Sequence, residues 1–316
     1  GQQTLLKGHM ERVTRKNADV EHNLEIDGIN MDIDGDWVKA KGTTLGADNG
    51  IGVAATMAIL ESTDIPHPPI EALFTVDEET GMTGAKGLKS GLLAGKILFN
   101  LDSEEDDEVT IGCAGGIDVA TSGNYREETA QNNLKGYKLS IKGLNGGHSG
   151  IQIHLGRGNA NKLMNRILFT ASNEHDLRIE SIDGGSLRNA IPRESFATIA
   201  VPTDNIESFK SYIKDITNIL IDEYKTTDPE LVILLENIES PKKVAEIEFQ
   251  NRFLNAIYGC PNGIYRLSPD MEDLTQTSKN LARVVLMDGK YSVQCLTRSS
   301  IETEKIDIAQ SIVSTF

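Results

Sequence analysis

Three short apolar runs in the first hundred residues are each followed at once by polar, ionisable side chains. The runs are residues 4–6, 70–76 and 96–101. They have the length and composition of buried β-strands. Residues 50–61 between the first two runs are rich in alanine, with apolar residues at helical intervals, and we expect Asp48 and Asn49 to cap this helix. Strands that alternate with helices are typical of an α/β layer with a largely parallel sheet.

From about residue 117 the pattern changes to a second unit. Its expected elements are strands at 137–143, 177–182, 194–201 and 230–236 and helices at 160–172 and 205–224. They follow one another in the order βαββαβ, which is the ferredoxin-like pattern. A helix near 246–258, a hairpin that turns at Asp288-Gly289 and a closing helix near 303–315 extend the unit.

Charge and cysteine content restrict the partners and the compartment. The 31 basic and 47 acidic residues give a net charge of −16, which repels nucleic acid and anionic lipid. No apolar run approaches the roughly 20 residues that a membrane span needs. Cys113, Cys260 and Cys295 lie far apart, without the spacing of a disulfide framework or a cysteine-rich zinc site. We therefore expect a cytoplasmic protein with no nucleic-acid or membrane partner.

The residues that follow the three apolar runs suggest a metal site. Ligands collect at the carboxyl ends of the strands in an open α/β sheet, and there this chain places His9, Glu78, Glu79 and Asp102. Asp48 joins them from the start of the helix. One imidazole with several carboxylates suits divalent metal ions. Two ions about 3.5–4 Å apart would need a shared carboxylate between them.

The adjacent glutamates point in different directions at a strand end, so Glu78 and Glu79 can take separate roles. One can bind metal while the other accepts a proton from water. Each signal alone is weak, because a pair of glutamates after a strand is usually solvated surface and Asp48 by itself is more often a helix cap. Their convergence is what favours a metal site.

Several strings of the sequence, taken in order, resemble one enzyme family. The strings GHMERV (8–13), GTTLGADNGIGVA (42–54), TVDEETGMTGA (75–85) and NLDSEE (100–105) resemble the metal-site segments of the co-catalytic zinc exopeptidases, which include carboxypeptidase G and related aminoacylases. GCAGGIDV (112–119) and GGHSGIQIHLGRGNANKL (146–163) are similar to the aminoacyl-histidine dipeptidase branch, also called Xaa-His or carnosinase-like dipeptidases. The resemblance spans nearly the whole chain.

The resemblance implies a pair of divalent ions, zinc first, with manganese or cobalt as alternatives. In this arrangement His9 binds one ion, Asp48 bridges both, Glu79 binds the other and Asp102 shares the ion of His9. Glu78 becomes the general base. Together these roles describe a metallo-dipeptidase, which hydrolyses peptide bonds with activated water.

Glu11 departs from the family pattern, which has aspartate two residues after the metal histidine. That aspartate orients the imidazole from outside the ligand set, and the extra methylene of Glu11 alters its reach. We place Glu11 beside Glu78 among the catalytic residues. The family also has a cis peptide after its bridging aspartate, which implies one between Asp48 and Asn49.

The second unit resembles the family's lid domain, through which relatives often pair, so we expect a homodimer. The resemblance implies that His148 in GGHSG holds the substrate and polarises the scissile carbonyl. Asn189 in GGSLRNAIP and Arg298 in LTRSS would grip the terminal carboxylate of a small peptide. An arginine fork can bind both carboxylate oxygens, although Arg298 taken alone is more often a surface charge.

The resemblance divides the chain into three parts. Residues 1–116 form a catalytic, metal-binding domain with a mostly parallel sheet flanked by helices, 117–305 an inserted α+β ferredoxin-like lid, and 306–316 the start of the return to the catalytic domain. In the family, a further metal-binding histidine follows the lid. We expect that segment, and residues upstream of Gly1, to lie outside this sequence.

Hydrolysis of Xaa-His dipeptides is the function that the resemblance implies. An amidohydrolase for N-acyl amino acids would use the same metal ions and is the first alternative. A non-catalytic homologue with a damaged metal site is the second, motivated by Glu11 and by the histidine that this sequence lacks.

Overall fold

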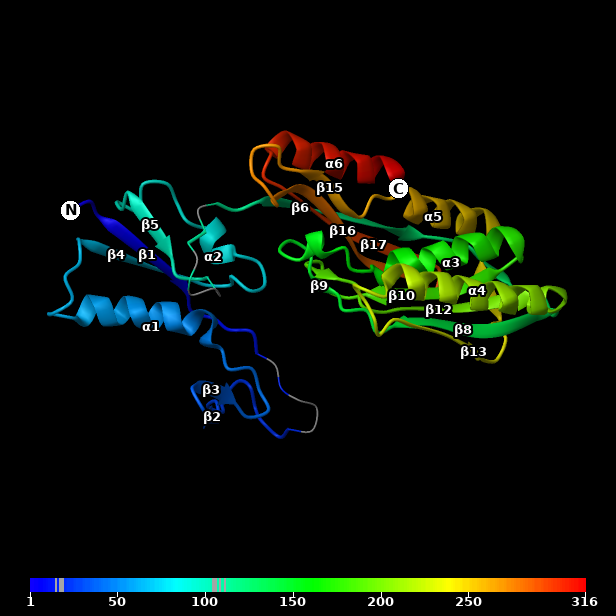
Figure 1. Cartoon of the computed structure of the whole chain (residues 1–316), viewed down its shortest axis with the longest axis horizontal. Coiled ribbons are helices and arrows are strands. Elements are labelled where there is room, and N and C mark those ends of the chain that lie inside the picture. The colour runs from blue at the N-terminus through cyan, green and yellow to red at the C-terminus, as the bar shows by residue number, and fades with distance from the viewer. Residues whose placement is uncertain (15, 17–19, 104–106, 108, 111) are drawn as a thin grey trace. The chain divides into compact units, whose positions relative to one another are not determined.

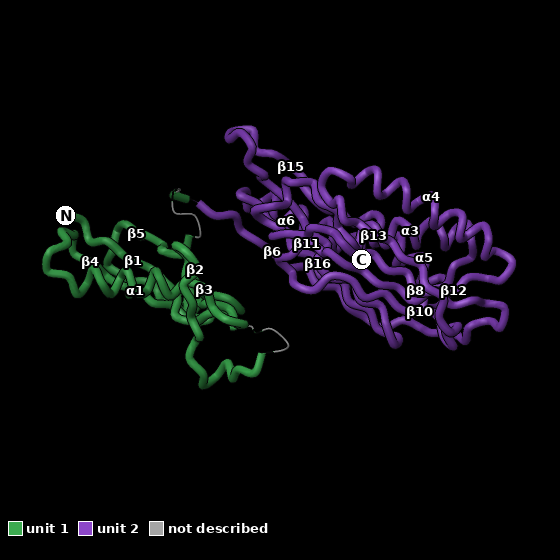
Figure 2. Tube along the Cα trace, turned by 60° about the horizontal axis from the view of Figure 1, so that its bottom comes forward, with its two compact units in different colours: residues 1–111 green, residues 112–316 purple. Residues whose placement is uncertain are grey.

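The chain folds into two compact units, Gly1–Ile111 and Gly112–Phe316 (Figure 2). The structure is a computed structural model, and it describes residues 1–316 except 15, 17–19, 104–106, 108 and 111. Within the described residues, no helix has the length and apolar character required to cross a membrane.

The first unit contains a parallel three-stranded sheet with the order β4-β1-β5 (Figure 1). The strands are β1 (Thr4–His9), β4 (Ile70–Thr75) and β5 (Ile97–Asn100). Both neighbours of β1 run parallel to it, so all three strands end at the same edge. The strands expected from the three apolar runs and their parallel arrangement are confirmed.

Helix α1 (Ala47–Glu61) packs against β1, but its first turn is not regular helix. Asp48 and Asn49 have non-helical backbone angles, and no side chain caps the helix, whose N-cap is Gly46. The expected capping role of Asp48 and Asn49 is therefore wrong. The irregular turn directs these two side chains toward the strand ends instead, as the hydrogen bonds of Asn49 show below.

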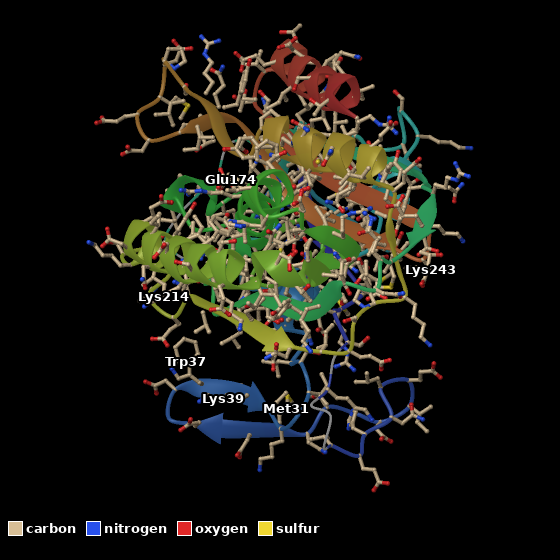
Figure 3. The ribbon with its side chains drawn as sticks, turned by 90° about the vertical axis from the view of Figure 1, so that its right-hand side faces the viewer. Met31, Trp37, Lys39, Glu174, Lys214 and Lys243 are labelled. Carbon is tan, nitrogen blue, oxygen red and sulfur yellow. The ribbon has the colours of Figure 1, made fainter. Side chains whose placement is uncertain are left out.

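A hairpin and a short helix complete the first unit. The hairpin consists of β2 (Met31–Asp34) and β3 (Trp37–Ala40), and α2 (Thr83–Lys86) follows β4. Figure 3 shows the side chains of Met31, Trp37 and Lys39 on this hairpin, where Met31 and Trp37 are 66% and 72% exposed. Two strands by themselves form only a marginally stable sheet, and this hairpin pairs only with itself among the described strands.

The second unit is an antiparallel sheet of eight strands with helices packed along it (Figure 1). The sheet order is β13-β8-β12-β10-β16-β17-β6, with β15 paired to β16. The strands are β6 (Gly115–Asn124), β8 (Leu134–Lys142), β10 (Arg178–Gly185), β12 (Ser195–Pro202), β13 (Val232–Asn237), β15 (Gly263–Leu267), β16 (Thr275–Met287) and β17 (Lys290–Ser299). The helices are α3 (Ala160–Glu174), α4 (Ile206–Tyr224), α5 (Ile247–Gly259) and α6 (Glu302–Thr315).

The order β8-α3-β10-β12-α4-β13 along the chain confirms the βαββαβ pattern. In space the four strands follow the order β13-β8-β12-β10, with antiparallel pairing throughout. The predicted hairpin is also confirmed: Met287 pairs with Lys290 across a turn at Asp288 and Gly289. Both turn residues have positive φ, as a tight hairpin turn requires.

The core of the second unit is continuous between the sheet and its helices. Helix α3 buries Leu163, Met164, Ile167, Leu168 and Ala171 at helical spacing. Burial of each large aliphatic side chain contributes about 1.5–3 kcal/mol before entropy is counted. This core fixes the sheet that carries the loops described below.

Two two-stranded pairs close the loops of the second unit. They are β7 (Glu127–Thr129) with β14 (Lys243–Ala245), and β9 (Gly147–His148) with β11 (Ala190–Ile191). The second pair joins the loop after β8 to the loop after β10. Two of the expected substrate-binding residues, His148 and Asn189, therefore lie at one place in the sheet's periphery.

Candidate metal centre and substrate-binding residues

His9 is the last residue of β1 and is only 1% exposed. Its Nε2 atom lies 3.2 Å from Oδ1 of Asp48 and 3.2 Å from Oδ1 of Asp102. Oε2 of Glu78 is 4.0 Å from the same nitrogen. The parallel strand ends and the first turn of α1 thus bring carboxylates from three segments to one imidazole nitrogen.

Two groups of three residues place potential ligand atoms within 4.8 Å of one another. One group is His9, Asp48 and Glu79, and the other is His9, Glu78 and Asp102. All five residues that the sequence suggested for this edge of the sheet are therefore brought together. Both glutamates lie within ligand distance of the site, so the geometry alone does not separate a metal ligand from a base.

The charges of this cluster fit divalent cations. Burial of the His9 ring opposes its protonation, but Asp102, the carbonyl of Glu11 and further carboxylates raise the pKa of His9 overall. Burial and the neighbouring carboxylates of Asp48 and Glu78 raise the pKa of Glu79. Four carboxylates around one imidazole leave excess negative charge, which metal ions would offset. The oxygen and nitrogen donors are those that zinc and manganese accept.

Glu11 contacts the cluster through hydrogen bonds to the backbone of both glutamates and through its own carbonyl, beside His9. Its Oε1 atom accepts hydrogen bonds from the backbone N–H of Glu78 and, at 3.3 Å, of Glu79. Burial acts in the opposite direction, but these backbone hydrogen bonds lower the pKa of Glu11 overall. The Nδ1 atom of His9 lies 3.0 Å from the carbonyl oxygen of Glu11 and 3.6 Å from Oε1. The carbonyl therefore makes the closer contact with the imidazole, and the carboxylate holds the turn of the two glutamates.

Asn49 links two segments of the site, a role that was not expected from the sequence. Its Oδ1 accepts the backbone N–H of His9 at 3.2 Å, and its Nδ2 donates to the carbonyl of Leu101. The peptide bond that precedes Asn49 is cis, as the family resemblance predicted. A Cβ atom at Gly8 or Gly52 would lie 2.6 or 2.7 Å from Oδ1 of Asn49. These two glycines are the sequence signal for a close approach.

The expected substrate-binding residues lie in the second unit. His148 pairs with Ala190, and the N–H of Ser149 donates to the carbonyl of Asn189 at 2.7 Å. The Nδ1 atom of His148 accepts the N–H of Ile151 at 3.1 Å. An accepting Nδ1 leaves Nε2 as the protonated nitrogen in a neutral ring.

Arg298 on β17 approaches the same loop. A Cβ atom built at Gly150 would lie 3.0 Å from Nε of Arg298 and 3.1 Å from Cε1 of His148. Both side chains therefore border the backbone at Gly150, where a larger residue would collide with them. The three residues expected to hold a peptide are neighbours within this unit.

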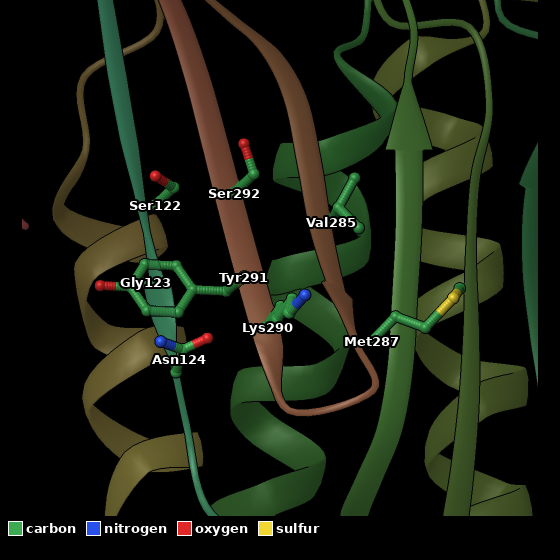
Figure 4. Close-up of a pocket in the computed structure, with 8 residues that line it drawn as sticks. All are labelled: Ser122, Gly123, Asn124, Val285, Met287, Lys290, Tyr291 and Ser292. Carbon is green, nitrogen blue, oxygen red and sulfur yellow. The ribbon is translucent and has the colours of Figure 1, made fainter.

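Another hollow in the second unit lacks the features of a catalytic site. Figure 4 shows this pocket at the hairpin end of β16 and β17. It is lined by Ser122, Gly123, Asn124, Val285, Met287, Lys290, Tyr291 and Ser292. Arg298 lies at the other end of β17. Among the described residues that line this pocket there is no carboxylate or imidazole.

Known proteins show strong similarity to both units. A family model of the M20 peptidase dimerisation domain matches residues 139–228. The cytosol non-specific dipeptidase of Escherichia coli strain K12 is 42% identical over 301 residues, which cover 95% of this chain and 62% of that protein. The crystal structure of aminoacylhistidine dipeptidase from Vibrio alginolyticus matches with a TM-score of 0.81 at 44% sequence identity, covering 99% of this chain and 64% of that one.

This chain is similar to a non-specific dipeptidase and to an aminoacylhistidine dipeptidase. The resemblance seen in the sequence strings is thereby confirmed, as is the expected fold class. The chain spans 62% of the length of the Escherichia coli protein and 64% of the length of the Vibrio alginolyticus protein.

Proposed function

We propose that the chain carries the metal centre and the peptide-gripping residues of a dipeptidase that accepts Xaa-His dipeptides. The observation that carries this proposal is the convergence of ligand atoms within 4.8 Å at the edge of the parallel sheet. The names of the two long relatives, a non-specific dipeptidase and an aminoacylhistidine dipeptidase, support the substrate class.

Two divalent cations, zinc first and manganese or cobalt as alternatives, would be held by His9, Asp48, Glu79 and Asp102. Asp48 is the candidate for the shared ligand, and Asp102 and His9 are candidates for one ion. When bound, such ions lower the pKa of water and polarise a carbonyl group. The fit rests on the donor types and on the excess of carboxylates around one imidazole.

Glu78 is the candidate for the general base, because the resemblance of the string TVDEETGMTGA to the Glu-Glu segment of the family gives this role to its first glutamate. Its carboxylate would accept a proton from the attacking water and later transfer it to the departing amine. Its side chain is only 25% exposed, and Oε2 lies 4.0 Å from His9 Nε2. A fixed base near the ligands shortens the path of the proton.

His148, Asn189 and Arg298 are the candidates for binding the peptide. The guanidinium of Arg298 would bind the terminal carboxylate, and the imidazole of His148 would polarise the scissile carbonyl. The match of residues 139–228 to a dimerisation domain supports a homodimer through the second unit. The name of the cytosol relative and the three free cysteines support a cytoplasmic location.

Hydrolysis of matched substrates tests the proposal. The zinc-loaded chain is incubated with Ala-His, with N-acetylhistidine and with Ala-His amide, and released histidine or histidine amide is quantified. We expect cleavage of Ala-His above both other compounds. Cleavage of N-acetylhistidine alone would establish the amidohydrolase instead. Full loading with zinc and no cleavage of any compound would favour the non-catalytic homologue.

A further inference from the structure

Arg298 and Asp118 share one face of the sheet in the second unit. Strand β17 pairs antiparallel with β6, so that Arg298 lies opposite Gly116 and Leu296 lies opposite Asp118. Residues opposite each other point to the same face, which makes Asp118 and Arg298 diagonal neighbours. Diagonal neighbours are within reach of a side chain as long as arginine, and Gly116 places no side chain between them.

Asp118 nevertheless forms its ion pair with a different arginine. Its Oδ2 atom lies 2.7 Å from Nη1 of Arg188, the residue that precedes Asn189. The backbone around Asn189 is fixed independently, because the side-chain amide of buried Asn280 donates to the carbonyls of Arg188 at 3.3 Å and Ala190 at 2.7 Å. The position of this loop therefore does not depend on the ion pair alone.

The guanidinium of Arg298 has an N–H group that is available to a further acceptor. Its Nε atom is buried and has no hydrogen-bond partner among the described residues. Burial lowers the pKa of Arg298, Asp118 counters this effect and Arg188 adds to it. A partly buried guanidinium gains free energy when a carboxylate binds to it. Asp118 and a substrate carboxylate would compete for this position.

We propose that Arg188 is a positioning residue that determines specificity, because it holds Asp118 away from Arg298 and so leaves that guanidinium for the carboxylate of a dipeptide. This inference rests on the proposed function. Arg188, Arg298 and Asp118 together carry one excess positive charge, which a single terminal carboxylate neutralises. A dipeptide ending in aspartate or glutamate brings a second negative charge, so the site favours neutral or basic side chains at that end.

Arg188→Met tests the competition directly. Without its partner, Asp118 is free to pair with Arg298, and we expect KM for Ala-His to rise about tenfold while kcat changes much less. The double variant Arg188→Met/Asp118→Asn removes the competing charge and returns KM to near the wild-type value. Arg166→Met is the control, because it breaks another arginine–carboxylate ion pair of the same unit, with Glu223, and leaves KM unchanged.

The double variant distinguishes the proposal from its alternatives. If Arg188 binds the substrate itself or only stabilises the loop, the double variant stays as impaired as Arg188→Met, and the proposal is overturned. An unchanged KM in Arg188→Met also overturns it. Asp118→Asn alone should raise the cleavage of Ala-Glu relative to Ala-Gln, since the excess positive charge increases by one. An unchanged ratio contradicts the charge argument.

A crystal structure of Arg188→Met gives a readout that does not depend on activity. We expect the Asp118 carboxylate to lie against the guanidinium of Arg298 in this variant. An Asp118 side chain that stays apart from Arg298 overturns the inference, even if dipeptides are cleaved. A wild-type protein that cleaves no dipeptide would defeat the proposed function, while this structure would still decide the competition.

Discussion

The ammonium group of Lys7 lies 3.0 Å from Oδ2 of Asp102, whose other oxygen lies 3.2 Å from Nε2 of His9. Lys7 and Asp102 are 14% and 13% exposed at their side chains, so water screens this pair only in part. Asp102 is therefore shared between a fixed cation of the protein and the candidate metal centre.

Lys7→Met should make the protein more dependent on metal. Loss of the ammonium leaves the clustered carboxylates less neutralised, which destabilises the metal-free protein and strengthens the attraction for a divalent cation. We expect the rise in Tm on addition of zinc to be larger in Lys7→Met than in wild type. Lys39→Met is the control, because its ion pair with Asp34 is exposed. Equal rises in all three proteins would contradict the role of Lys7.

Glu11→Ala should weaken zinc binding by about 10–100-fold, the usual effect of losing a residue that orients metal ligands. The carboxylate of Glu11 accepts the backbone N–H groups of both Glu78 and Glu79, so its removal frees the turn that carries them. Glu11→Gln keeps an accepting oxygen and should lose less affinity. Competition with a zinc chelator measures both variants, and equal losses in the two would refute the hydrogen-bonding explanation.

Glu78→Gln should keep the metal ions and lose turnover. An amide cannot accept the proton, and removal of a general base typically costs about 10²–10⁴-fold in rate. The measurement is kcat for Ala-His at full zinc loading, with Glu61→Gln on the exposed end of α1 as the control. If Glu78→Gln loses zinc instead, Glu78 is a ligand and the base lies elsewhere.

A buried thiol pair makes stability depend on pH. A hydrogen bond from Cys295 lowers the pKa of Cys260 from 9.0 to about 6, against the effect of burial, and Lys279 also donates to this sulfur. The lowered pKa of Cys260 contributes stability that is lost progressively as the pH falls from 9.0 to about 6. Above pH 9.0 the raised pKa of Cys295, the other thiol of the pair, acts in the opposite direction.

Urea unfolding at pH 9 and pH 5.5 tests this effect. The free energy of unfolding of wild type, relative to that of Cys260→Ser, should be larger at pH 9. Cys113→Ser is the control, because Cys113 is exposed and should follow wild type at both values. A constant difference between wild type and Cys260→Ser would show that Cys260 does not ionise in the folded protein.

Local patterns in the sequence were enough to predict the parallel strands of the first unit and the four strands of the βαββαβ pattern, but not β2, β3, β6 or β15. The apolar runs that form β1, β4 and β5 place His9, Glu78, Glu79 and Asp102 at one edge, because parallel strands share their carboxyl ends. Hydrophobic periodicity and segment length were enough to predict the βαββαβ order. These features depend on neighbouring residues and not on distant contacts.

Contacts between distant segments were not predictable in the same way. The helix periodicity of residues 50–61 does not reveal that Asn49 leaves the helix to join His9 and Leu101, 40 and 52 residues away. Family resemblance placed Glu11 near His9, but only the folded turn shows that its carboxylate holds Glu78 and Glu79. The ion pair of Arg188 and Asp118 likewise depends on the strand register.

The number of zinc ions bound per chain, measured by elemental analysis after equilibration with excess zinc and gel filtration, tests the metal centre most directly. We predict two ions in the wild-type protein and a loss of at least one in Asp48→Ala, with circular dichroism showing that the variant stays folded. A wild-type protein without bound zinc, or an Asp48→Ala variant that retains both ions, would contradict a centre bridged by Asp48.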